Sequence, residues 1–177
     1  MPAAIMSAAD TAVTIPLSVL FADLEEELAA TRRMLERFPD EHADWKPHEK
    51  SATLAQLATH VAELPQFGSA IASLPEWVAG VNKFDRVHGK TREEILAIHD
   101  KSATIAKEAL GRLDSAAIGH EWRMRMGDKV MFSGARGPLI RRMLFSHIAH
   151  HRGQLSVYYR MLDVPVPGMF GPSADEK

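Results

Sequence analysis

Apolar residues recur every three or four positions in four long segments of this chain, and this spacing limits the possible folds more than any other feature. Such spacing places the apolar side chains on one face of an α-helix, and that face has to be buried. The expected helices span 17–38, 51–74, 91–113 and 137–162. Four amphipathic helices in 177 residues predict an all-α fold, a four-helix bundle that forms one domain over 1–177.

Local signals mark the ends of these helices. Pro39 ends the first helix, and the polar stretch 39–50 that begins there is predicted to be a loop. Ser51 is a suitable N-cap for the second helix, and Pro65 should kink that helix because it cannot donate a backbone hydrogen bond. The sequence Thr91-Arg-Glu-Glu has the spacing of a capping box and should open the third helix.

The span 119–134 has a different period from the helices. Apolar residues alternate there with arginines up to a Gly127-Asp128 pair. This pattern predicts a short β-hairpin, although an ordered loop before the last helix explains the same span. Residues 75–90 are expected to be irregular. The chain does not start with the basic residues of a signal peptide, so residues 1–14 are expected to form a flexible leader.

The composition excludes several classes of site and partner. The chain has no cysteine, so disulfides and thiolate ligands are excluded and a metal site would use His, Asp or Glu. The net charge of −2 argues against binding along a nucleic-acid backbone. No apolar run approaches the roughly 20 residues that span a bilayer. We therefore expect a small-molecule substrate, no nucleic-acid or membrane partner, and a cytoplasmic location, for which the lack of cysteine is typical.

Charge is unevenly distributed along the chain. Residues 115–177 hold nine Lys and Arg against five Asp and Glu, whereas the first 114 residues hold twelve against eighteen. One interpretation is that these charges simply lie on solvated faces of the folded domain. The alternative is a local cationic rim that attracts a small anionic substrate.

Two histidines interrupt the apolar seam of the last helix. The seam consists of Ile140, Leu144, His147, His151, Leu155, Tyr158 and Leu162. Because His147 and His151 are one helical turn apart, their Cβ atoms lie about 6 Å from each other. Both imidazoles can then reach one ion at about 2.0–2.1 Å. A buried imidazole needs a partner for each ring nitrogen, and a metal ion supplies one of them.

His60 is the third candidate ligand, because it also replaces an apolar residue in a helical seam. Three neutral imidazoles leave a divalent ion its full charge and at least one open coordination position. That arrangement is typical of a catalytic metal site rather than a closed structural one. The alternative is that each histidine is a hydrogen-bonded core residue, which is common for a single buried histidine.

Other polar residues near these histidines are weaker candidates. Glu63 could orient a ligand imidazole or lie in solvent, and His150 could support the site, be a fourth ligand or lie on the surface. Arg152 could bind a substrate carboxylate, with exposure as the alternative, and Tyr158 is expected to pack rather than to act as an acid or base. The histidines expected to have no role are His42, His48, His88, His99 and His120.

Two stretches resemble the DinB/YfiT-like metalloenzyme superfamily. HIAHHRGQLSVYYRMLDVPVPGMFGPSADE (147–176) is similar to its C-terminal signature, with Phe170 where tyrosine is common. WKPHEKSATLAQLATHVAEL (45–64) is similar to the helix that carries its first metal ligand. The resemblance implies an up-down-down-up bundle, often a homodimer, that holds a divalent metal, usually zinc or nickel. The positions that match the family's metal ligands are His60, His147 and His151.

The resemblance also implies an activity. Characterised members include S-transferases that use bacillithiol and a mycothiol-dependent isomerase, whereas the family name refers to DNA-damage induction and does not imply DNA binding. The expected function is activation of an external low-molecular-weight thiol, or water, at the metal for attack on a small electrophile. The alternatives are a metal-dependent hydrolase, a non-catalytic bundle that binds a metal or ligand, and a structural bundle without metal.

Overall fold

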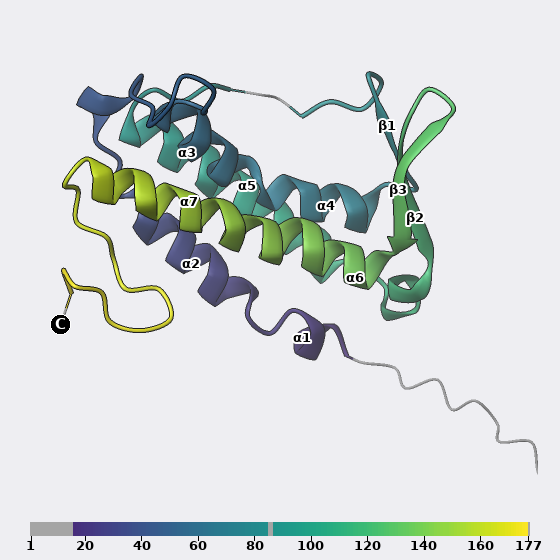
Figure 1. The fold of residues 1–177 in the computed structure, drawn as a ribbon. Coiled ribbons are helices and arrows are strands. Elements are labelled where there is room, and N and C mark those ends of the chain that lie inside the picture. Colours follow the sequence, from purple (N-terminus) through teal and green to yellow (C-terminus); the bar gives the residue numbers. More distant parts are fainter. Residues whose placement is uncertain (1–15, 85–86, 177) are drawn as a thin grey trace, which may run out of the picture.

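The computed structural model describes residues 16–84 and 87–176, so the predicted leader at 1–14 lies outside the described residues. The helices lie side by side, with a small sheet at one end of the bundle (Figure 1). The elements are α1 Leu17–Leu20, α2 Leu24–Leu35, α3 Leu54–Glu63, α4 Pro65–Ser73, β1 Trp77–Ala79, α5 Arg92–Gly111, β2 Glu121–Met126, β3 Lys129–Ala135, α6 Arg136–Ile140 and α7 His147–Met161. Within the described ranges, no helix has the length and apolarity needed to cross a membrane.

The first predicted helix is broken rather than continuous. α1 ends at Leu20 and α2 begins at Leu24. At the break, Phe21 turns inward and stacks on Phe145, with 6.0 Å between the ring centroids. The guanidinium of Arg141 donates to the carbonyl of Leu20 at 3.2 Å and to the carboxylate of Asp23 at 2.5 Å. Groups more than 100 positions away in the sequence therefore stabilise the break.

The second predicted helix is divided at its proline. α3 ends at Glu63 and α4 begins at Pro65, so the predicted kink is confirmed. The N-cap prediction at Ser51 is wrong, because the helix begins two residues later. Thr53 caps it, and a reciprocal capping box joins Thr53 to Gln56. The capping box predicted at Thr91 is confirmed at the start of α5.

Contacts between the helices fix their directions. Arg32 pairs with Asp100, and Glu25 pairs with Lys107, so α2 and α5 run antiparallel. α3 runs parallel to α5, because Thr59 contacts Gly89 and, farther along both helices, Ala62 contacts Ser102. α2 runs parallel to α6 and α7, because Asp23 pairs with Arg141 and, farther along, Glu27 pairs with Arg152. The four helical segments, α1–α2, α3–α4, α5 and α6–α7, therefore run up, down, down and up, as the resemblance implies (Figure 1).

The predicted hairpin is confirmed, but the all-α prediction is incomplete. β2 and β3 pair antiparallel, and Gly127 closes the turn with a positive φ of 57°. β1 then adds a parallel third strand beside β2, within the stretch predicted to be irregular. Side chains fasten it there: Glu76 accepts hydrogen bonds from Arg123 and Arg125, and the indole of Trp122 donates to the carbonyl of Leu74 at 3.1 Å.

A π-helical turn, Arg141–Ser146, joins α6 to α7 and widens the helix directly before His147. Gly68 of α4 permits the close approach of this turn, because a Cβ atom there would lie 2.5 Å from Leu144 Cδ1. The most buried line along α7 is Ile148, Arg152, Leu155 and Tyr159. The histidines were predicted to lie in the middle of the buried seam, and they lie at its edge instead.

Candidate metal centre

The three histidines predicted to bind a metal come together between α3 and α7. Each offers one ring nitrogen, and these three nitrogens lie within 4.8 Å of one another. The ring centroid of His60 is 5.3 Å from that of His147 and 4.5 Å from that of His151. All three side chains are half-buried, so the cluster is partly shielded from water. Among the described residues this is the one group of His, Asp and Glu side chains with such an arrangement.

Local structure positions each of these imidazoles. His60 lies in the last turn of α3, directly before the break at Pro65. His147 is the first residue of α7 after the π-helical turn, and His151 follows one turn later. The ring of Phe67, on α4, lies 6.2 Å from the ring of His147 and forms an apolar neighbour of the cluster. Two helix irregularities therefore flank the site.

The donor set fits a divalent metal ion. The Nε2 atoms of His147 and His151 are 2.9 Å apart. Two nitrogens that each lie about 2.0–2.1 Å from one ion are separated by about 2.9–3.4 Å, so the observed distance is at the short end of this range. His60 contributes a third nitrogen from the facing helix. Three imidazoles and no cysteine match the ligand preferences of divalent transition metals in general.

Gln154 orients one of these imidazoles, a role that was not predicted from the sequence. Its side-chain oxygen lies 2.8 Å from Nδ1 of His151. Because an amide oxygen only accepts, Nδ1 of His151 carries the proton and Nε2 presents its lone pair toward His147. The signal was present in the sequence, since Gln154 lies three residues after His151 and so on the same side of the helix.

Replacement of Gln154 by alanine is expected to weaken metal binding about 10- to 100-fold without unfolding the protein. The substitution frees the His151 ring to rotate and to adopt the other tautomer, while the three ligands remain. Competition with a chromogenic chelator measures the affinity. Ser156→Ala, in the same helix, is the control and should bind metal like the unmodified protein. An affinity unchanged in Gln154→Ala would contradict the orienting role.

The electrostatics of the site favour the neutral form of His147 and of His151. Burial lowers the pKa of His147 below its ordinary value of 6.5, and positive charge on His151 or His150 would lower it further. Burial also lowers the pKa of His151, although its hydrogen bond to Gln154 opposes this shift. Neutral imidazoles are the form that binds a metal, so the site is prepared for an ion at neutral pH.

The direction of these shifts predicts how metal retention depends on pH. A proton and a metal ion compete for the same ring nitrogen. Because the folded-state pKa values of His147 and His151 are lowered, neutral rings persist below pH about 6.5. Metal should therefore be retained at that pH and released as the pH falls further, through the lowered pKa values. A titration from about pH 8 to about pH 4 with a metal-sensitive dye measures the release. Half-release above pH about 7 would contradict the prediction.

Arg152 is placed differently from both sequence-based alternatives. It is 2% exposed and lies on the α2 side of α7, where its guanidinium pairs with Glu27 at 2.8 Å and donates to Thr31 at 3.1 Å. The ring of Phe170 lies over it at 5.4 Å. The prediction that Arg152 is exposed is therefore wrong. Its guanidinium, which was considered for binding a substrate carboxylate, is instead paired with Glu27.

The remaining candidates are not among the three clustered histidines. His150 is exposed, with its ring centroid 4.7 Å from that of His151. Glu63 is half-buried on α3, one turn after His60. The hydroxyl of Tyr158 donates to the carbonyl of Ala52 at 3.3 Å and so fastens the loop before α3 to α7, which agrees with the packing role expected for it.

The histidines expected to have no role lie outside the cluster. One of them, His99, is nevertheless a core residue that is 2% exposed, with Nδ1 3.3 Å from Asp100. Its burial lowers its pKa. The others are half-buried or exposed: His42, His48, His88 and His120.

Five of the nine Lys and Arg residues in 115–177 form ion pairs within the chain. Ion pairs to carboxylates engage Arg123, Arg125, Arg141, Arg152 and Arg160. These contacts join distant segments, such as β2 to the stretch before β1. They favour a structural role for the charge over the cationic rim that was considered from the sequence.

Comparison with known proteins agrees with this architecture. The sequence profile of the DinB family matches residues 6–176. The chain is similar in structure to a DinB-like protein from Bacillus cereus ATCC 10987, with a TM-score of 0.67 and 21% identity over 86% of this chain and 97% of that one. A DinB-like protein from Bacillus subtilis gives a TM-score of 0.65 and 16% identity over 85% and 96% of the two chains. No curated protein matches significantly.

Proposed function

Because the chain belongs to the DinB family, we propose that it is a metal-dependent enzyme that promotes attack of an external low-molecular-weight thiol, or of water, on a small electrophile. The observation that carries the proposal is the convergence of His60, His147 and His151 from two helices, with their ring nitrogens within 4.8 Å. These residues would hold one divalent ion, zinc or nickel. When bound, such an ion supplies charge that lowers the pKa of a thiol or water.

The residues of this chain would prepare the site in three ways. Three uncharged donors leave the positive charge of an ion undiminished, unlike a set that contains carboxylates. Gln154 fixes the ring orientation of His151. Half-burial of the histidines and the neighbouring Phe67 ring reduce the access of water, which strengthens electrostatic interactions inside the site. A thiol would have to come from a cosubstrate, because the chain has no cysteine.

Elemental analysis of protein purified without a nickel column is the first test. We expect about one zinc or nickel ion per chain, since the three histidines form one site. An anomalous-scattering map should then place the ion among the three imidazoles. Protein that takes up no divalent metal under any loading condition would contradict the proposal and would indicate a structural bundle.

A thiol-transfer screen is the second test. The metal-loaded protein is incubated with several low-molecular-weight thiols and with electrophiles such as aryl halides and epoxides, and thiol consumption is followed. Metal-dependent thiol transfer is the expected result. Turnover with water and without any thiol would instead indicate a hydrolase. Bound metal without turnover on either panel would indicate a non-catalytic binding protein.

A further inference from the structure

Aromatic side chains flank the three-histidine cluster along the line where α3 and α4 meet α7. Phe67 follows His60 by seven residues, which is about two helical turns, so both side chains leave α3–α4 on the same face. Tyr158 follows His151 by the same interval on α7. The end of α7 meets the start of α3, where Tyr158 contacts Ala52. The two aromatic residues therefore lie at opposite ends of the cluster.

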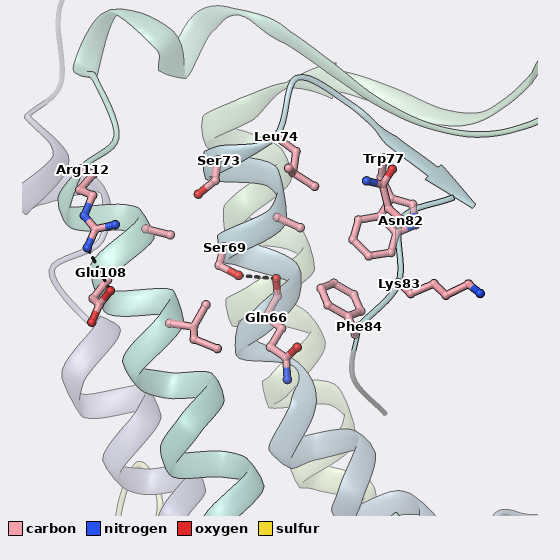
Figure 2. Close-up of a pocket in the computed structure, with 13 residues that line it drawn as sticks. Gln66, Ser69, Ser73, Leu74, Trp77, Asn82, Lys83, Phe84, Glu108 and Arg112 are labelled. Atoms are coloured by element: carbon pink, nitrogen blue, oxygen red, sulfur yellow. Dashed lines mark hydrogen bonds and ion pairs between the residues drawn. The ribbon is translucent and has the colours of Figure 1, made fainter. Parts of the chain in front are cut away.

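The ring of Phe67 is close to the cluster and is held in place. Its centroid lies 6.2 Å from that of His147, and its side chain is half-buried. Phe84 packs edge-on against Phe67 with 4.9 Å between the ring centroids. Phe84 is itself stacked on Trp77 at 4.4 Å, in the stretch that runs beside α4 (Figure 2). A fixed apolar surface therefore lies beside one of the three histidines.

The helix positions around the histidines carry no basic side chain. Residues three, four and seven positions from a histidine share its side of the helix. In α3, α4 and the helical turns from Ile140 to Tyr158, all within the described residues, these positions hold no Lys or Arg and a single carboxylate, that of Glu63. Arg152, next to His151 in the sequence, pairs with Glu27 on α2 instead. Apart from a bound metal ion, these positions offer an anionic group no opposite charge.

We propose that the electrophile that binds at this site is uncharged and carries an aromatic or other apolar group, which Phe67 selects. The inference rests on the proposed function, because it places the substrate beside a metal held by the three histidines. Contact with the Phe67 ring would remove apolar surface of both groups from water. At the opposite end of the cluster, Tyr158 and Trp45 pack edge-on, with 5.6 Å between their centroids, and form a second aromatic boundary.

Hydroxamates that differ in one substituent test the proposal. Acetohydroxamate and benzohydroxamate bind a metal through the same two oxygens, and only the second carries a phenyl ring. Titration of cobalt-loaded protein is followed by the visible absorption of the ion and corrected for the affinity of each probe for free cobalt. Benzohydroxamate should bind at least about tenfold more tightly, and 4-carboxybenzohydroxamate should lose most of this gain. Equal affinities for the first two probes, or tighter binding of the carboxylate-bearing probe, would overturn the proposal.

Variants of Phe67 show whether this residue causes the preference. Phe67→Ala should reduce the preference for benzohydroxamate to within about threefold and leave acetohydroxamate binding unchanged, because the histidines remain. Phe67→Gln keeps most of the side-chain volume and should give the same loss, so it serves if the alanine variant does not fold. Phe132→Ala is the matched control, because it also removes a half-buried ring, from β3, and it should keep the full preference. An unchanged preference in a folded Phe67 variant would overturn the proposal.

The same titrations separate failure of this inference from failure of the proposed function. Cobalt uptake followed by equal affinities for acetohydroxamate and benzohydroxamate would overturn the inference and leave the metal centre intact. Protein that takes up no cobalt, or whose cobalt absorption responds to neither probe, would contradict the proposed function and the inference together.

Discussion

Replacement of His147 by alanine is expected to lower the affinity for divalent metal by more than about 100-fold. Loss of a residue that only orients a ligand costs about 10- to 100-fold, and His147 would be a ligand itself. The substitution also removes the imidazole whose Nε2 lies 2.9 Å from that of His151, so two nitrogens on facing helices remain. Metal content after dialysis, with chelator competition for the affinity, measures the effect.

Two histidine variants provide the controls for this experiment. His150→Ala removes an exposed ring whose centroid is 4.7 Å from that of His151, and His42→Ala removes a ring from the turn after α2. Both proteins should retain full metal occupancy, because neither residue belongs to the cluster. Full occupancy in His147→Ala would show that the metal binds elsewhere. Loss of metal in His150→Ala would make that residue a fourth ligand.

The parts of the fold that were predicted correctly depend on neighbours in the sequence. The Thr91 capping box and the break at Pro65 each follow from chemistry within a few residues. The parts that were missed depend on distant partners. β1 has three residues, too few for a periodic signal, and it forms because Glu76 meets two arginines of β2. The break after Leu20 similarly needs Arg141.

The candidate site was predicted to a similar extent and for similar reasons. A histidine in an apolar seam is an anomaly that the sequence displays, so the ligand trio could be proposed, with the family resemblance as support. The partner of a polar residue is not displayed. Arg152 precedes Gln154 by two residues, yet one turns toward Glu27 on α2 and the other toward His151. Only the packing of α2 against α7 reveals which residue belongs to the site.

Replacement of Arg152 by alanine is expected to destabilise the protein by about 3–5 kcal/mol. The ion pair with Glu27 is buried, with side-chain exposures of 3% and 14%, and the same guanidinium donates to Thr31 at 3.1 Å. Without Arg152 the carboxylate of Glu27 would remain largely shielded from water with no compensating charge. Urea unfolding of the metal-free protein measures the loss, because bound metal would otherwise contribute to stability.

The double variant Arg152→Met, Glu27→Leu decides whether the ion pair itself stabilises the fold. Replacement of both charges by apolar groups of similar size removes the uncompensated carboxylate, so we expect most of the lost stability to return. The pair would then act mainly by fixing how α7 packs on α2, and thereby the direction in which the adjacent residue His151 points. In that case the double variant should fold stably but bind metal more weakly. If the double variant were as unstable as Arg152→Ala, the uncompensated charge of Glu27 would not be the cause of the lost stability.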